Sequence, residues 1–150
     1  MISTCKDSRF FNFILFSQMH PSYFEVQFSV PAPVQDWPKE FAILSGYATT
    51  GEVWTDERNS AADRALGETI FVIGVWRERI TGFFDDTGHS EPGWAAELDL
   101  DAACDLGLKF LQDAIYYVQG DALSVSYCDD RRALVPVGSF RKRVRAESGS

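Results

Sequence analysis

The sequence contains few of the residues that most often carry chemistry in small proteins. It has 3 cysteines, 2 histidines and 2 methionines among 150 residues. Cys5, Cys104 and Cys128 are an odd number, lie far apart and form no CxxC pair. This spacing argues against a disulfide framework and a cysteine zinc site, and it favours a reducing cytoplasmic location. Cys104 and Cys128 fall at patterned helix and strand positions, so we expect both to be small core residues.

Long hydrophobic runs and recognisable catalytic motifs are also missing. The strongest apolar run near the start, FFNFILF at residues 10–16, is too short to span a bilayer. No small-residue cleavage site follows it, so we expect neither a membrane association nor a secretory signal. The chain contains no GxSxG, P-loop, GxGxxG or HExxH pattern, so the sequence names no reaction and we expect no cofactor.

Basic residues are scarce relative to acidic ones, and the two are separated along the chain. The net charge of −8 argues against a nucleic-acid partner, because phosphate neutralisation needs a concentrated Lys/Arg face. Residues 80–108 hold seven acids and no Lys or Arg, whereas residues 131–145 hold six bases and no acid. The acidic segment is either a solvated face or a surface for a cationic partner.

Apolar and aromatic residues, in contrast, are plentiful. The chain is 45% hydrophobic and has 12 Phe, 5 Tyr and 4 Trp, enough for one sizeable core. We expect a single domain over residues 19–140, an N-terminal appendage over 1–18 and a basic flexible tail over 141–150. Met19 is an alternative start, because a strand-like alternation begins only after it.

The first half of the expected domain alternates between strand and helix patterns. Residues 23–30 alternate like a strand with Phe24 and Val26 inward, and residues 41–44 form a short apolar strand. Thr55 or Asp56 begins a helix that buries Ala62, Leu66 and Ile70. Its last turns either continue to Ile73 or merge into a strand at 71–73. A strand at 75–84, a turn at 85–88 and a strand at 94–98 follow.

The second half is organised around one helix and one hairpin. Asp99 or Asp101 caps a helix of about three turns, with Ala103 or Cys104, Leu108 and Leu111 along its inner side. Residues 114–119 and 123–128 form a hairpin that reverses at Gly120, and residues 134–137 add an edge strand. These patterns predict an α+β fold, with a mainly antiparallel sheet and two helices packed on one face.

Several short motifs, in order, resemble a known family. They are residues 41–47, then Asn59 with Ala62 and Leu66, then residues 89–92, then residues 110–115. Their order and spacing resemble the bacterial domain-of-unknown-function family 3293 over about residues 41–128. This chain has Ala48-Thr49 where that family tends to show Asn-Pro after the first strand. The resemblance implies a fold and a set of positions, and it implies no reaction.

One short segment gathers most of the reactive side chains. Asp85, Asp86, His89 and Glu91 lie within seven residues. His89 beside carboxylates is suited to general base catalysis, and the four together are a candidate divalent metal site. The alternative, which we favour, is a surface turn whose carboxylates bond nearby backbone N–H groups.

Four further polar residues adjoin the expected core, and the resemblance draws attention to them: Tyr47, Asn59, Gln112 and Asp113. One interpretation is a cleft at the sheet edge that reads a ligand through amide hydrogen bonds. The other, which we favour, is that the buried amides satisfy loop backbone groups and hold Glu91 in place.

Two functions of different classes remain. The first, which we favour, is a small acidic binding or regulatory protein without catalysis, acting through a protein partner as inhibitors, immunity proteins and adaptors do. The second is a small hydrolase or small-ligand-binding enzyme that uses Glu91 and His89. Geometry discriminates between them: convergence of Glu91, His89, Asn59 and Gln112 in one cleft favours the second.

Overall fold

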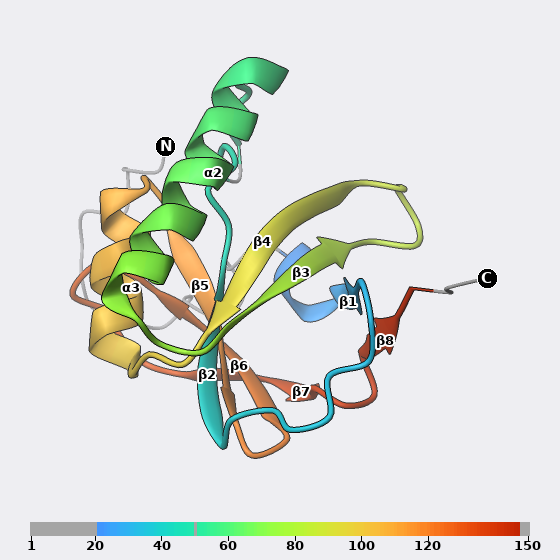
Figure 1. Ribbon diagram of the computed structural model, residues 1–150. Coiled ribbons are helices and arrows are strands. Elements are labelled where there is room, and N and C mark those ends of the chain that lie inside the picture. The colour runs from blue at the N-terminus through green and yellow to red at the C-terminus, as the bar shows by residue number, and fades with distance from the viewer. Residues whose placement is uncertain (1–20, 50, 148–150) are drawn as a thin grey trace, which may run out of the picture.

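The computed structural model describes residues 21–49 and 51–147, which form one strongly curled sheet with two helices against it (Figure 1). The eight strands of the sheet lie in the order β7-β6-β5-β2-β4-β3-β1-β8. Every pair of neighbours is antiparallel except β1 and β8, which are parallel. The prediction of an α+β fold with a mainly antiparallel sheet is therefore confirmed.

The elements follow one another in this order: η2 (Pro21–Phe24), β1 (Gln27–Val30), β2 (Glu40–Leu44), α2 (Asp56–Ile73), β3 (Arg77–Phe83), β4 (Ser90–Ala96), α3 (Leu100–Lys109), β5 (Ala114–Gln119), β6 (Ala122–Tyr127), β7 (Val135–Ser139) and β8 (Val144–Ala146). The first strand is shorter than its alternation predicted, because residues 21–24 form a 3-10 helix. Among the described residues, no helix has the length and apolar content that crossing a membrane requires. The predicted appendage, residues 1–18, lies outside the described range.

The predicted hairpin is present at the expected register. Strands β5 and β6 pair from Ala114 with Tyr127 to Gln119 with Ala122, which leaves a two-residue reversal at Gly120 and Asp121. Gly120 has a φ of 63°, the left-handed conformation that such a reversal needs. The predicted edge strand is β7, which pairs with β6.

Helix α2 begins after its predicted N-cap, and its last turns remain helical. The Thr55 hydroxyl accepts a hydrogen bond from the Arg58 N–H at 3.1 Å, and the helix then continues to Ile73. The alternative of a strand at residues 71–73 is wrong. Leu66 and Ile70 are fully buried, whereas Phe71 and Val72 are 67% and 82% exposed.

Helix α3 begins at its predicted cap and buries Ala103 and Cys104 as predicted, but the other two predicted inner residues are exposed. Asp99 accepts a hydrogen bond from the Ala102 N–H at 2.8 Å. The expected inner residues Leu108 and Leu111 are 46% and 57% exposed, so that prediction is wrong. The helix buries Leu106 instead, and a Cβ at Gly107 would lie 2.7 Å from the Cys128 Sγ, so only glycine fits there.

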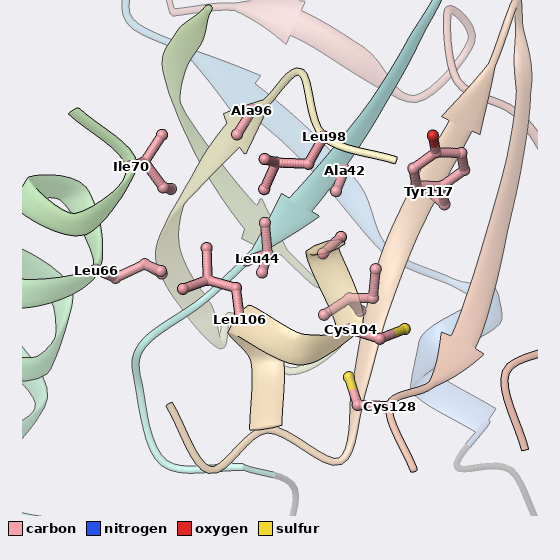
Figure 2. Close-up of a cluster of buried hydrophobic side chains, with 12 residues drawn as sticks. Ala42, Leu44, Leu66, Ile70, Ala96, Leu98, Cys104, Leu106, Tyr117 and Cys128 are labelled. Atoms are coloured by element: carbon pink, nitrogen blue, oxygen red, sulfur yellow. The ribbon is translucent and has the colours of Figure 1, made fainter. Parts of the chain in front are cut away.

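The two largest buried clusters lie on opposite faces of the curled sheet. Alternate strand residues such as Ala42, Leu44 and Ala96 share one cluster with side chains of both helices (Figure 2). This cluster also holds Cys104 and Cys128 as buried free thiols, as predicted. The opposite, concave face carries the second cluster, whose members come from the strands, from the residue before β1 and from the turn after β7: Val26, Phe28, Val30, Phe41, Ile43, Ile80, Ala95, Val118, Leu123 and Phe140.

The two edges of the sheet are joined by a short turn, and one arginine contacts both. The Arg143 guanidinium donates to the carbonyls of Phe24 and Val26, each at 3.0 Å, and to that of Val137 at 3.3 Å. Residues 144–146 then pair with β1. We expected no ordered structure from Arg141 onward, because the segment has little apolar content. That expectation is wrong for residues 144–146, since backbone pairing with β1 and the packing of Val144 against buried strand residues hold the segment in place.

Candidate functional site

The concave side of the sheet opens into a cavity of about 770 Å³. Its walls come from η2, the loop that follows β2, the end of the β3–β4 hairpin and the start of β5. The interior is apolar and aromatic, formed by side chains such as Val26, Phe28, Ile43, Ile80 and Tyr116. Both the volume and the apolar walls are typical of small-molecule sites.

Glu91 reaches this cavity because β4 begins earlier than the sequence predicted. We predicted a turn at residues 85–88 and a strand only from residue 94, but β4 starts at Ser90 and Glu91 pairs with Gly82 of β3. The alternation of the strand then puts Glu91 and Gly93 on the same face as buried Ala95, which is the concave one. The side chain of Glu91 is 30% exposed, so the cavity half-buries its carboxylate.

His89 lies beside Glu91 at the rim. Its Nε2 is 3.4 Å from the Glu91 Oε2, and its ring stacks on Phe84 with centroids 6.2 Å apart. The imidazole is 59% exposed. The pair therefore offers an acceptor inside the cavity and a proton-carrying group at its mouth.

Tyr116 contributes a neutral hydroxyl to the cavity wall. Burial raises its pKa well above the ordinary value for tyrosine, and the negative charge of Glu91 adds to the shift. Its hydroxyl donates to the Tyr23 carbonyl at 3.1 Å, and its ring meets that of Phe28 edge to face. The phenol thus ties η2 to β5 across the cavity.

Asn59 and Gln112, the two amide residues among the predicted site residues, fix the loop that forms one side of the cavity. Asn59 on α2 accepts a hydrogen bond at its Oδ1 from the Ala48 N–H, at 2.9 Å. The Gln112 Nε2 donates to the Tyr47 carbonyl at 2.7 Å. A third contact comes from the Asp113 N–H, which donates to the Thr49 hydroxyl at 3.2 Å. The 45–49 loop is therefore attached to α2 and to the segment before β5.

These contacts bear on the two interpretations of the amides. Asn59 and Gln112 do satisfy loop backbone groups, as the favoured interpretation expected. They do not hold Glu91 in place, since in the described part of the chain its hydrogen-bonding contact is with His89. Glu91 therefore keeps acceptor capacity that faces the cavity.

The remaining predicted residues do not assemble into a site. No group of three or more possible metal ligands exists among the described residues, so Asp85, Asp86, His89 and Glu91 form no metal cluster. Asp85 points to Arg145, with an Oδ1–Nη2 distance of 3.8 Å. Asp113 contributes its backbone only, and its side chain is exposed.

An ion pair on the helix side supports the wall behind Glu91. Asp63 of α2 is 7% exposed, and its Oδ2 lies 2.5 Å from the Arg79 Nη2. The Arg79 Nη1 also donates to the Gly93 carbonyl at 3.2 Å, and its guanidinium lies over the Trp94 ring. Sequence reasoning missed this pair, because the two residues belong to different elements and no spacing rule connects them.

Sequence reasoning also missed Ser45, Thr49 and Tyr116 as parts of the site. The Ser45 hydroxyl accepts from the Tyr47 N–H at 3.0 Å and donates to the Pro92 carbonyl at 3.4 Å. The available signal was the Ser-Gly step directly after an apolar strand, because polar loop residues at strand ends commonly line sites.

Comparisons with known proteins agree with the resemblance found in the sequence. No curated protein and no solved structure matches the chain. The model of the family described as protein of unknown function DUF3293 matches residues 48–115, a segment that includes Asn59, His89, Glu91 and Gln112. The resemblance found in the sequence is therefore confirmed over residues 48–115, where the chain matches the DUF3293 family model.

Proposed function

We propose that this protein binds a small molecule in the cavity on the concave side of its sheet, with Glu91 as the polar group that anchors the ligand. The observation that carries the proposal is convergence. Residues that the sequence singled out in separate segments line one cavity of about 770 Å³: Tyr47, Asn59, His89, Glu91 and Gln112. Convergence in one cleft is the outcome that favours a ligand site over a flat partner surface.

The proposal assumes that both helices pack on one face of the sheet, as predicted, so that the other face is left for the ligand. The shared cluster of Leu66, Leu106 and Ala42 supports this arrangement. Preorganisation supports it too, because the 45–49 loop is fixed by Asn59 and Gln112 before any ligand enters. Glu91 and His89 supply an acceptor and an acid–base group, and we propose binding rather than a particular reaction.

The test is a screen in which the cavity itself is blocked. Ala114 lines the cavity at the start of β5, so Ala114→Phe should fill part of it. Ala122→Phe, at an exposed alanine on the neighbouring strand, is the matched control. A library of small metabolites is tested for thermal stabilisation of the full chain. We expect hits that stabilise the parent and Ala122→Phe and lose their effect on Ala114→Phe.

Two results would contradict the proposal. One is a library with no stabilising compound. The other is a set of hits that stabilise Ala114→Phe as strongly as the parent, which would place their site outside the cavity.

A protein partner is the second candidate, and a different surface favours it. The C-terminal end of α2 exposes Phe71, Val72 and Ile73 in succession. Exposed apolar residues in a contiguous group are typical of interaction surfaces. A photo-crosslinking residue at Val72 should trap one defined partner in cells, whereas one at exposed Glu68 on the same helix should not. Equal labelling from both positions would remove this candidate.

We also propose a cytoplasmic location. Cys104 and Cys128 are both buried near one another in one cluster and both are free. Unpaired thiols fit a reducing compartment. Fractionation of source cells with a tagged full chain tests the location, and recovery from an extracellular or membrane fraction would contradict it.

A further inference from the structure

In the described part of the chain, the cavity lining contains acidic side chains but no Lys or Arg. Among the described residues that line it, none is Lys or Arg, whereas four carry carboxyl groups: Glu25, Glu52, Asp86 and Glu91. Three of these are exposed, and only Glu91 is half-buried. The described lining therefore carries acidic side chains with no Lys or Arg among them, and Glu91 is the one that the apolar wall shields most from solvent.

The remaining lining groups suit an apolar or aromatic body. The rings of Tyr23, Phe28 and Tyr116 meet edge to face along one wall, with centroids 6.1 Å and 5.4 Å apart for the two pairs that include Tyr116. Phe84 and Trp54 also line the cavity, although His89 stacks on the Phe84 ring and the Arg58 guanidinium lies over the Trp54 ring. Aromatic faces attract cations as well as apolar groups.

Several polar side chains of the cavity lining have other hydrogen-bond partners, so the Glu91 carboxylate can accept a hydrogen bond from a ligand. The Tyr116 hydroxyl is engaged by the Tyr23 carbonyl, and the amides of Asn59 and Gln112 face the 45–49 loop. Gly82, the strand partner of Glu91, has no side chain, and a Cβ there would come no closer than 3.4 Å to its neighbours. A donor from a ligand can therefore approach Glu91 from the cavity.

From this combination we infer that the ligand is an organic cation, a protonated amine on an apolar or aromatic body. Its ammonium group donates to the Glu91 carboxylate and its body lies against the aromatic wall. A ligand whose recognised group is a carboxylate or a phosphate is disfavoured, because no Lys or Arg lines the cavity to meet it. This inference rests on the proposed function and names its ligand class.

Three probes of nearly equal shape test the inference. Phenethylamine, phenethyl alcohol and hydrocinnamate share an aromatic body and differ in charge. Binding to the full chain is followed by chemical-shift changes of backbone amides. We expect phenethylamine to bind most tightly, with shifts at residues around Glu91, and hydrocinnamate to bind at least about tenfold more weakly. Added salt should weaken the amine and leave the alcohol unchanged.

Two variants of the rim locate the charge effect. Glu91→Gln keeps the shape of the side chain and removes its charge, so it should weaken phenethylamine at least about tenfold and leave phenethyl alcohol unchanged. His89→Lys places a fixed positive charge beside Glu91 and should have the same effect. Ala65→Lys adds the same charge at an exposed position of α2 that does not line the cavity, so it is the matched control and should retain amine binding.

The outcomes separate the ligand class from the proposed function. If hydrocinnamate binds as well as phenethylamine, or Glu91→Gln does not weaken the amine, the inference is overturned, and loss of binding in Ala114→Phe would still uphold a small-molecule site. If none of the probes binds, the inference is overturned, and the metabolite screen decides on the proposed function by itself.

Discussion

Asn59 and Gln112 hold the same loop by opposite hydrogen-bonding roles. The Asn59 Oδ1 accepts from the Ala48 N–H, whereas the Gln112 Nε2 donates to the Tyr47 carbonyl. The loop between these contacts lines the cavity, so two residues from separate elements fix one wall of the proposed binding site. The difference between acceptor and donor makes the contacts testable by nearly isosteric substitutions.

Asn59→Asp should leave stability nearly unchanged, because the new carboxylate still accepts from the Ala48 N–H. Gln112→Glu should lower the free energy of unfolding by about 1–3 kcal/mol, because a buried donor to the Tyr47 carbonyl is lost. Urea unfolding of both variants measures the difference. Equal losses in the two variants would show that the side chains act through something other than these hydrogen bonds.

Arg143→Met should lower the free energy of unfolding by about 1–3 kcal/mol, because three backbone carbonyls at the two edges of the sheet lose a charged donor. Arg141→Met is the matched control, since the Arg141 side chain is 71% exposed, and it should change stability by less than about 0.5 kcal/mol. Chemical denaturation measures both. Equal effects would contradict the role assigned to Arg143.

The Glu147 N–H should be protected from hydrogen exchange, because it donates to the Val30 carbonyl at 2.7 Å beside the β1–β8 pairing. In Arg143→Met this protection should fall while that of the β5–β6 hairpin persists. Exchange measured by NMR at individual amides distinguishes the two regions. An unprotected Glu147 amide in the parent would contradict the pairing of β8.

Stability should decline as the pH rises above about 9, in part through Cys128. Burial raises the pKa of its thiol far above the ordinary value of 9.0, so the folded state keeps a proton that the unfolded state loses. The contribution of the protonated Cys128 thiol to the free energy of unfolding is intact below pH 9. It decreases as the pH rises, and the loss is about 1.4 kcal/mol at pH 10. Cys128→Ala should be less stable overall but show a flatter decline between pH 8 and pH 10, measured by urea unfolding under reducing conditions. An unchanged slope would contradict the burial of this thiol.

Local signals in the sequence predicted the elements that local interactions determine. The Thr55 and Asp99 caps and the Gly120 reversal each depend on a few neighbouring residues, and all three are present. The face of α3 was missed because Leu108 fits a helical spacing as well as Leu106 does. Only packing of Gly107 against Cys128 selects between them.

The sequence predicted several residues of the site but not how they are arranged around the cavity. The predicted strand began only at residue 94, after Pro92, yet Pro92 lies where β2 does not pair with β4, so the strand tolerates it. This extension is what brings Glu91 into the cavity. Strand β8 was missed because its parallel pairing with β1 joins distant segments and leaves no periodic pattern of its own.

Glu91 decides between the two accounts of the site. The sequence alone favoured a structural role, in which Glu91→Gln lowers the free energy of unfolding by about 1–3 kcal/mol through the loss of a charged acceptor. The structure leaves Glu91 with His89 as its contact, at 3.4 Å, and with a carboxylate open to the cavity. A group held for a ligand contributes little to folding.

The most direct test measures stability and binding on the same Glu91→Gln protein. We predict a free energy of unfolding within about 0.5 kcal/mol of the parent, together with at least a tenfold loss of affinity for phenethylamine, about 1.4 kcal/mol. A variant that is clearly less stable than the parent, yet binds phenethylamine as tightly, would contradict the account and return Glu91 to a structural role.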